Sequence, residues 1–394
     1  MKTESTGAAG VTTAEQSVYQ RYSAAAQATE SSLCCPVEYQ NQKLLAVIPE
    51  EILDRDYGCG DPTPFVRAGE TVVDLGSGGG KLCYMIAQIV GHEGSVIGVD
   101  CNREMRALAQ KYQTQIATAL GYNNVSFRYG MIQDLALDLE QLATRLAEHP
   151  VQDPESWLKL RQTEAELRQT SPMIPDNSVD CIVSNCVLNL VRRQDREQLF
   201  EEMHRVLKIG GRVAISDIVC DETVPADLQS DAELWSGCIS GAFREDEFID
   251  AFAAAGFYGM QVVRRQEKPW RVVRGIEFRS VTIMAWKGSP EPALDLHQAA
   301  IYRGPFARVQ DDDGRIFERG QRTAVSDQTF RRLSGEPYQP LFDLIEPYQP
   351  VDPKKARPMS EDTQHLRSPA QSKGADYALT MSATDSCCGT EGCC

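Results

Sequence analysis

Three cysteines occur in contexts where a thiol can meet a ligand. Cys59 lies in DYGCGDP, Cys186 in SNCVLNLV and Cys238 in LWSGCISGA. Glycines on both sides of Cys59 predict an exposed turn rather than a core position, and a glycine also precedes Cys238. Each of the three has an alternative as a small buried hydrophobe, which is a common environment for a cysteine without a disulfide.

Three converging thiolates would suit a soft, thiophilic centre. Zinc prefers four ligands and closely spaced C-x₂-C pairs, which these cysteines do not provide. Trivalent arsenic takes three sulfurs in a pyramid and keeps a lone pair that can attack a methyl carbon. The segment 184–191 offers no base or acidic side chain for a nitrogen or oxygen acceptor. Three converging thiols at these positions would therefore suit trivalent arsenic.

A glycine loop indicates a second binding site. DLGSGGG follows an apolar run of strand length and precedes a helical pattern, with Gly76, Gly78 and Gly80 at alternate positions. Asp100 closes the next predicted strand, where a carboxylate can accept hydrogen bonds from ribose hydroxyls. The last glycine follows the second by two residues, not by the three of the dinucleotide-binding fingerprint.

The elements that must position these residues alternate along the chain. Strands are predicted at 70–75, 95–100, 124–130, 178–185 and 210–218, with helices at 81–91, 102–121, 192–207 and 244–255. Asn102 is the predicted N-cap of the second helix. Two late strands, 258–266 and 278–288, have no helix between them, which indicates an antiparallel pair. The pattern predicts a doubly wound, Rossmann-like α/β sheet of about seven strands, on which the first, fourth and fifth strands end at one crevice.

The D-x-G-x-G-x-G form resembles motif I of S-adenosylmethionine-dependent methyltransferases, and the resemblance covers about 70–287. It implies that the glycine loop lines the methionine end of the cofactor, that Asp100 binds its ribose, and that Met105 flanks its adenine. The complete set of cofactor-contact residues predicted in this way is Asp74, Gly76, Ser77, Gly78, Gly80, Asp100, Cys101, Met105, Ile132, Gln133 and Asn185.

Five ordered motifs closely resemble arsenite methyltransferases: DYGCG, DLGSGGGK, VSNCVLNLV, RVLKIGGRVAISDI and LWSGCISGA. The resemblance implies methyl transfer from S-adenosylmethionine to arsenite or its glutathione conjugate, with Cys59, Cys186 and Cys238 as the arsenic-binding thiols. It also implies an N-terminal cysteine that pairs with Cys59 during turnover, for which Cys35 is slightly preferred over Cys34. A thiol reductant, glutathione or thioredoxin, would restore the trivalent state.

Two other functions fit part of the pattern. A C-methyltransferase acting on a quinone or lipid would use the same cofactor, with the thiols incidental. A metalloid-binding protein without turnover would depend mainly on the terminal CCGTEGCC, whose cysteines could capture As(III), deliver electrons or be dispensable.

Composition limits the class of protein. The net charge of −16 over 394 residues argues against nucleic acid and anionic membranes as main partners. An apolar run of transmembrane length and a signal-peptide core are both absent from the sequence, so we expect a cytoplasmic protein. We also expect a monomer. Thirteen cysteines in a reducing compartment favour thiol chemistry over a disulfide framework.

Composition shifts divide the chain into four expected regions. They are an N-terminal helical cap over 1–69, a cofactor-binding domain over 70–288, a small β-rich appendage over 289–346 and a disordered cysteine-ended tail over 347–394. Apolar periodicity between two prolines predicts a helical insertion at about 136–171, either a flap or an inert surface hairpin.

Overall fold

The computed structural model describes residues 14–30, 33, 37, 39–289, 293–359 and 366–373. These residues belong to two compact units, Met1–Gly288 and Ser289–Cys394. The catalytic and cofactor-binding residues predicted from the sequence fall in the first unit. Two of them, Cys34 and Cys35, lie outside the described residues. The same holds for the cysteines of the C-terminal CCGTEGCC.

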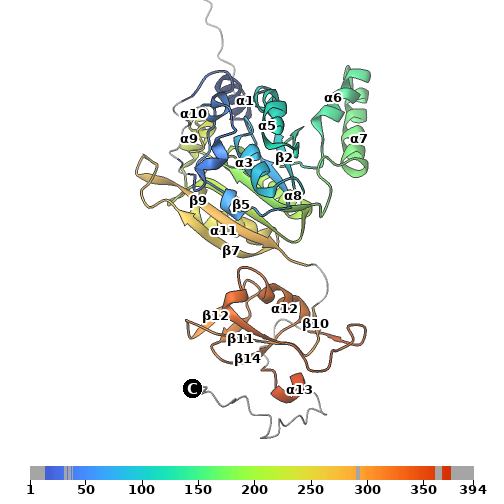
Figure 1. The fold of residues 1–394 in the computed structure, drawn as a ribbon. Helices are drawn as coiled ribbons and strands as arrows, with labels where there is room; N and C mark the ends of the chain where they lie inside the picture. The colour runs from blue at the N-terminus through green and yellow to red at the C-terminus, as the bar shows by residue number, and fades with distance from the viewer. Residues whose placement is uncertain are drawn as a thin grey trace, which may run out of the picture. The chain divides into compact units, whose positions relative to one another are not determined.

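The first unit is built on a mixed sheet (Figure 1). Its strand order is β3-β2-β1-β4-β5-β9-β7. Neighbours from β3 to β5 are parallel, whereas β9 is antiparallel to both β5 and β7. The main strands are β1 (Thr71–Leu75), β2 (Ser95–Asp100), β3 (Val125–Tyr129), β4 (Val179–Asn185), β5 (Leu207–Cys220), β7 (Phe257–Arg265) and β9 (Ile276–Lys287). Two short strands, β6 (Phe243–Arg244) and β8 (Arg271–Val273), join its margin. The predicted doubly wound α/β sheet is confirmed.

Helices cover both faces of this sheet. Side chains alternate between faces along a strand, and in β1 the carboxylate of Asp74 meets Cys83 of α3 (Lys81–Val90). The adjacent Val73 and Leu75 instead belong to the core that includes Phe200 and Phe252. Those two residues lie on α8 (Arg196–Val206) and α11 (Glu245–Ala254), which therefore cover the opposite face.

The second helical pattern departs from its prediction. The single helix expected over 102–121 is two helices, α4 (Arg103–Lys111) and α5 (Gln113–Leu120), which are separated at Tyr112. Tyr112 has φ −104° and ψ 1°, outside the α-helical region, so the helical path is interrupted there. Asn102 caps α4 as predicted, because its side chain accepts a hydrogen bond from the Met105 amide.

The N-terminal segment contributes α1 (Ala14–Ala25), α2 (Glu50–Leu53) and the 3₁₀ turns η2 (Gln42–Leu45) and η3 (Thr63–Phe65). Helix α1 lies beside α10 (Ala232–Ser236), which follows α9 (Ala226–Gln229) (Figure 1). Ser17 donates to the Ala232 carbonyl at 3.1 Å and Arg21 donates to the Glu233 carbonyl at 3.0 Å. A segment near the start of the chain is thus fixed next to the region of Cys238.

The segment between β3 and β4 forms the helices α6 (Leu139–Glu148) and α7 (Pro154–Thr170). Leu142 and Leu167 share a small apolar cluster that holds the two helices together. Arg168 anchors the pair to the sheet domain through an ion pair with Asp134 at 2.8 Å. Trp157 and Leu158 on the outer face of α7 are about half exposed, at 52% and 56%.

The second unit is small and rich in β-structure, as predicted. Strand β11 (Ala299–Tyr302) pairs with β14 (Arg322–Ala324) and β15 (Phe342–Ile345), and α12 (Asp327–Ser334) packs on them. Strands β12 (Arg308–Gln310) and β13 (Ile316–Glu318) pair as an antiparallel hairpin. Its remaining elements are β10 (Leu294–Asp295), η6 (Gln339–Leu341), β16 (Arg357–Pro358) and α13 (Pro369–Lys373).

The expectation of disorder from residue 347 onward is wrong for part of that segment. Strand β16 pairs with β10, and Arg367 is buried with its guanidinium bonded to Asp295. A buried arginine needs such a partner, and the composition of the segment did not reveal this one.

Candidate active site

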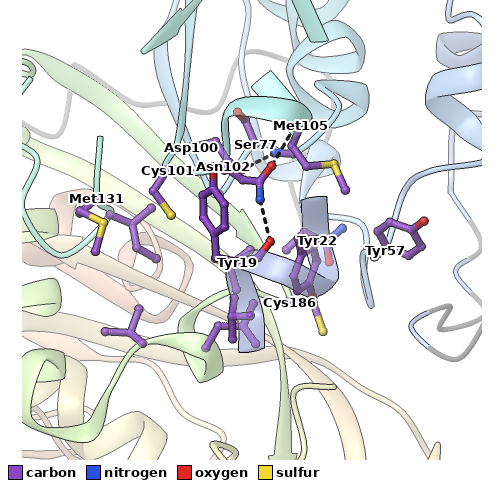
Figure 2. Close-up of a pocket in the computed structure, with 18 of the residues that line it drawn as sticks. Tyr19, Tyr22, Tyr57, Ser77, Asp100, Cys101, Asn102, Met105, Met131 and Cys186 are labelled. Atoms are coloured by element: carbon purple, nitrogen blue, oxygen red, sulfur yellow. Dashed lines mark hydrogen bonds between the residues drawn. The ribbon is translucent and has the colours of Figure 1, made fainter. Parts of the chain in front are cut away.

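A cavity of about 520 Å³ opens at the carboxyl ends of β1, β2 and β4. This volume is in the range of small-molecule binding sites. Figure 2 shows Ser77, Asp100, Asn102 and Met105 gathered at one end and Cys186 at the other. We call these the cofactor end and the thiol end.

The glycine loop leaves room at the cofactor end. Gly76 and Gly78 have φ of 70° and 51°, a left-handed backbone that favours glycine. A β-carbon at Gly76 would lie 2.4 Å from Val187, whereas one at Gly78 would meet no atom within 4 Å. Ser77 lines the cavity, and its hydroxyl is buried beside Gly98 of β2 without a hydrogen-bond partner among the described residues. These features fit a polar ligand lying against the loop.

Asp100 organises the same end of the cavity. Its two carboxylate oxygens accept hydrogen bonds from the backbone N–H groups of Gly78, at 2.8 Å, and Asn102, at 2.7 Å. Burial raises the pKa of this carboxyl, and the two backbone donors oppose the rise. Asp100 lines the cavity at the end of β2, the position from which a ribose can be bound.

Asp74 is buried behind the loop and accepts a hydrogen bond from the Cys83 thiol at 3.2 Å. Burial raises the pKa of Asp74 to about 7, and the nearby negative charge of Asp100 acts in the same direction. Asp74 also lines the cavity. Its carboxyl is therefore poised to change charge near neutral pH.

Most of the other predicted cofactor residues also line the cavity, and one does not. The lining includes Cys101, Met105, Ile132, Gln133 and Asn185. Gly80 lies outside this lining, because it begins α3 in a left-handed conformation where a β-carbon would meet Phe127 at 2.9 Å. The absence of a side chain at Gly80 allows α3 to pack closely against Phe127 of β3.

Helix α1 supplies cavity residues that the sequence reasoning missed. Tyr19 and Tyr22 both line the cavity (Figure 2). The Asn102 side-chain amide donates to the Tyr19 carbonyl at 3.2 Å and to the Ser23 hydroxyl at 3.0 Å. The available signal was the spacing of the two tyrosines, since residues three apart share one face of a helix.

Cys186 and Cys238 share an unusual backbone conformation at the thiol end. Their φ angles are 66° and 61°, in the left-handed region that non-glycine residues rarely occupy. Such strain is concentrated at functional sites. The Cys238 thiol donates to the Cys186 carbonyl at 3.3 Å, and the Tyr22 hydroxyl is hydrogen-bonded to Cys238. Burial and these neighbouring thiols raise the pKa of Tyr22.

Asn185 holds Cys59 against the end of β4. Its side-chain oxygen accepts the backbone N–H groups of Cys59 at 2.8 Å and Gly60 at 3.0 Å, and its amide donates to the Gly60 carbonyl at 2.7 Å. A β-carbon at Gly58 would lie 2.3 Å from the Asn185 amide nitrogen. The prediction of an exposed turn is thus wrong: Cys59 is only 5% exposed, and its flanking glycines permit close packing.

Asp217 is an acidic side chain at the thiol end, where the sequence analysis expected none. One donor atom from each of Cys59, Cys186 and Asp217 lies within 4.8 Å of the other two. The segment 184–191 itself carries no acidic side chain, but β5 runs parallel to β4 and places Ser216, the neighbour of Asp217, opposite Asn185. Burial raises the pKa of Asp217 to about 6.

The three predicted arsenic ligands are therefore brought to one buried apolar cluster. Within the described residues, the close group of donor atoms contains Cys59 and Cys186 but not Cys238. None of the helices in the described part of the chain has the length and apolar character needed to cross a membrane.

The fold and this cavity are those of a methyltransferase. Residues 67–256 match a family described as "Methyltransferase domain", and residues 289–377 match one described as "Domain of unknown function (DUF8838)". The chain is 32% identical to an arsenite methyltransferase of Aquipseudomonas alcaligenes, over 80% of this chain and 85% of that protein. It is 28% identical to the arsenite methyltransferase of Homo sapiens, over 79% and 76%. The chain therefore belongs to the arsenite methyltransferase family.

A solved structure agrees with this fold. The crystal structure of an arsenic(III) S-adenosylmethionine methyltransferase from Chlamydomonas reinhardtii superposes with a TM-score of 0.51 and 23% identity. The match covers 83% of this chain and 97% of that one, and at this identity it supports the architecture alone.

Proposed function

We propose that this protein transfers methyl groups from S-adenosylmethionine to trivalent arsenic held by Cys59, Cys186 and Cys238. The observation that carries the proposal is that Cys186 lies at the opposite end of the cavity from a loop that fits the cofactor, while the donor atom of Cys59, which is outside the cavity lining, lies within 4.8 Å of the Cys186 sulfur. Family membership supports arsenite as the substrate.

The cofactor end is suited to orient an adenosine-containing ligand. Asp100 would hold the ribose, and Ser77 and Gly78, which also line the cavity, would lie against the amino acid portion. When bound, S-adenosylmethionine supplies an electrophilic methyl group on a sulfonium sulfur. The loop after β4 carries Cys186 along the wall of the same cavity, which gives an acceptor on that thiol a path to the methyl group.

The thiol end is suited to an acceptor that needs no base for attack. Arsenic bound to sulfurs attacks through its lone pair, so no proton has to leave the nucleophile. The strained backbone at Cys186 and Cys238 and the Asn185 clamp on Cys59 fix the thiols before arsenic arrives, and such positioning supplies much of a rate enhancement. The burial of these residues limits the access of water.

Attack by the lone pair oxidises arsenic from the trivalent to the pentavalent state, and two thiols that form a disulfide return the electrons. We propose Cys59 with Cys35 or Cys34 as the first source, and glutathione or thioredoxin as the final reductant. The protein would act as a cytoplasmic monomer on arsenite or its glutathione conjugate.

The test is a methylation assay with purified protein, As(III), glutathione and labelled S-adenosylmethionine, followed by separation of the arsenic species. We expect mono- and dimethylated arsenic. Cys186→Ser and Cys238→Ser should each lower turnover by more than about 100-fold, while affinity for S-adenosylhomocysteine is kept. Absence of methylated arsenic from a folded, cofactor-binding protein would refute the proposal and favour a quinone or lipid acceptor, or a binding protein without turnover.

A further inference from the structure

Cys59, Cys186 and Asp217 form a group of two sulfur donors and one oxygen donor. Their donor atoms lie within 4.8 Å of one another, and the residues are 5%, 5% and 1% exposed. A site for arsenic alone requires sulfur, because As(III) is thiophilic. The carboxylate therefore indicates an additional ligand chemistry at this position.

We propose that these three residues bind a divalent thiophilic cation of the zinc or cadmium class, in competition with trivalent arsenic. Zinc accepts cysteine and carboxylate ligands together, and sites with three protein ligands keep a fourth position open. As ligands, two thiolates and a carboxylate would bring three negative charges into a buried site, and a divalent cation would offset most of that charge.

The separations agree with such a cation. Zn–S bonds of about 2.3 Å and Zn–O bonds of about 2.0–2.2 Å put tetrahedral ligands roughly 3.5–3.8 Å apart. The observed upper limit of 4.8 Å leaves only small side-chain rotations to bring the donors to these distances. Cys186 lines the cavity, which gives an ion a path to the site.

Asp217 is held in a fixed orientation, as ligating carboxylates usually are. Its Oδ1 accepts the Asn189 side-chain amide at 2.7 Å and the Ile218 N–H at 2.8 Å. Its Oδ2 accepts the Leu188 N–H at 2.8 Å. An oxygen that accepts one such bond retains capacity for a second contact.

The site thereby offers two alternative third ligands beside the shared pair Cys59 and Cys186. Cys238 contacts the Cys186 carbonyl through its thiol and would complete a three-sulfur set for arsenic. Asp217 would complete a mixed set for a divalent cation, which tolerates oxygen. The arsenic half of this contrast rests on the proposed function, whereas the cation half does not.

The spacing of cysteines along the chain gave no indication of this site. Zinc was disfavoured because C-x₂-C pairs are absent, but the fold brings ligands together from a loop before β1, the end of β4 and the end of β5. A cation bound there would occupy both thiols that arsenic needs, so it would inhibit methylation by competing with arsenite.

The test uses Cd²⁺ and the full-length chain in which six other cysteines are replaced by serine, so that their thiols cannot bind the ion. They are the cysteines at positions 34, 35, 387, 388, 393 and 394. Affinity is followed by sulfur-to-cadmium charge-transfer absorption, and the ligand set by X-ray absorption. We expect one tightly bound Cd²⁺ with two sulfurs and lighter atoms in its first shell.

Two variants in this background separate the ligand sets. Asp217→Asn should weaken Cd²⁺ binding by at least about tenfold, whereas Cys238→Ser should change it less than about twofold. For As(III) the pattern should reverse, with Cys238→Ser the damaging change. Thermal unfolding and S-adenosylhomocysteine binding establish that each variant is folded.

A cadmium shell of three or more sulfurs, or unchanged Cd²⁺ affinity in a folded Asp217→Asn variant, would overturn the inference. If that variant does not fold, the number of sulfur ligands around Cd²⁺ in the parent protein, measured by X-ray absorption, tests the inference by itself. Cadmium binding with two sulfurs but no arsenic methylation would leave this inference standing and refute only the proposed function.

Discussion

The two ends of the cavity are built in different ways. At the cofactor end, one acidic side chain, Asp100, fixes backbone N–H groups two and twenty-two residues away along the chain. At the thiol end, Asn185 reaches across 126 residues to Cys59, and Cys238 reaches across 52 residues to Cys186. The Asp100 contacts that shape the glycine loop are thus short-range, and the long-range contact at that end is the one from Asn102 to α1. The contacts that fix the thiols are long-range.

This difference predicts different sensitivities. Short-range contacts form with the strand and loop that contain them, so the cofactor end should be disturbed mainly by changes within the glycine loop and β2. The thiol end depends on the mutual placement of β4, β5, α1 and the segment before β1. Single side chains at those junctions should therefore affect the thiols while the cofactor end remains intact.

The largest effect is expected from a substitution at the cofactor end that leaves the thiol end intact. Asp100→Ala removes the acceptor of two backbone N–H groups, and we expect affinity for S-adenosylhomocysteine to fall about 10- to 100-fold because buried donors lose their partner. Calorimetry measures this affinity, and binding of As(III) should be unchanged. Asp250→Ala, at an exposed position on α11, is the control. A parallel loss of arsenic binding would contradict the independence of the two ends.

Asn185→Ala should disturb the position of Cys59 and so weaken arsenic binding at the thiol end. Three hydrogen bonds to the Cys59 segment are lost, which corresponds to roughly 2–4 kcal/mol of unfolding free energy. We expect As(III) affinity to fall by about tenfold or more, with a smaller change in cofactor affinity. Denaturant unfolding and arsenic titration measure the two effects, with the exposed Asn123→Ala as control. Unchanged arsenic affinity would show that the hydrogen bonds from Asn185 are not needed to position Cys59.

Tyr22→Phe should give a smaller effect, and it tests whether α1 contributes to the thiol end. The change removes the hydroxyl bonded to Cys238 and leaves the ring, which packs edge-on to Tyr57 with centroids 6.2 Å apart. We expect a severalfold decrease in kcat with little change in cofactor affinity. Tyr19→Phe is a matched control on the same helix, since that hydroxyl contacts Glu104 instead. Equal decreases in kcat for the two substitutions would show that the contact between Tyr22 and Cys238 has no specific role in turnover.

The smallest effect concerns pH and the cofactor end. Burial raises the pKa of Asp74 to about 7 from an unfolded value of about 3.9. The folded carboxyl therefore keeps its proton where the unfolded chain has lost it, so stability from this group is full below pH ~4 and is lost as pH rises through 7. In Asp74→Asn the decrease in melting temperature from pH 5 to pH 8 should be smaller than in the parent. An identical decrease would refute the assignment.

Local patterns in the sequence carried the prediction of the cofactor end. The positions of Asp74, Gly76, Ser77, Gly78 and Asp100 follow from a strand, a tight turn and the next strand, and all five line the cavity. Gly80 lies outside the lining, and the motif alone does not distinguish a glycine that leaves room for a ligand from one that leaves room for Phe127. The contribution of α1 was missed, since nothing in its local pattern says which surface it covers.

For the thiol end, the sequence determined that thiols would be available at strand ends, and only the tertiary structure decided their environment. Cys59 is buried because Asn185 folds its loop inward, and Asp217 enters the site because β5 lies parallel beside β4. Glycine spacing and apolar alternation express the preferences of a few neighbouring residues. Which donors meet depends on strand order and register, and these are fixed by burying the whole sheet between its helices.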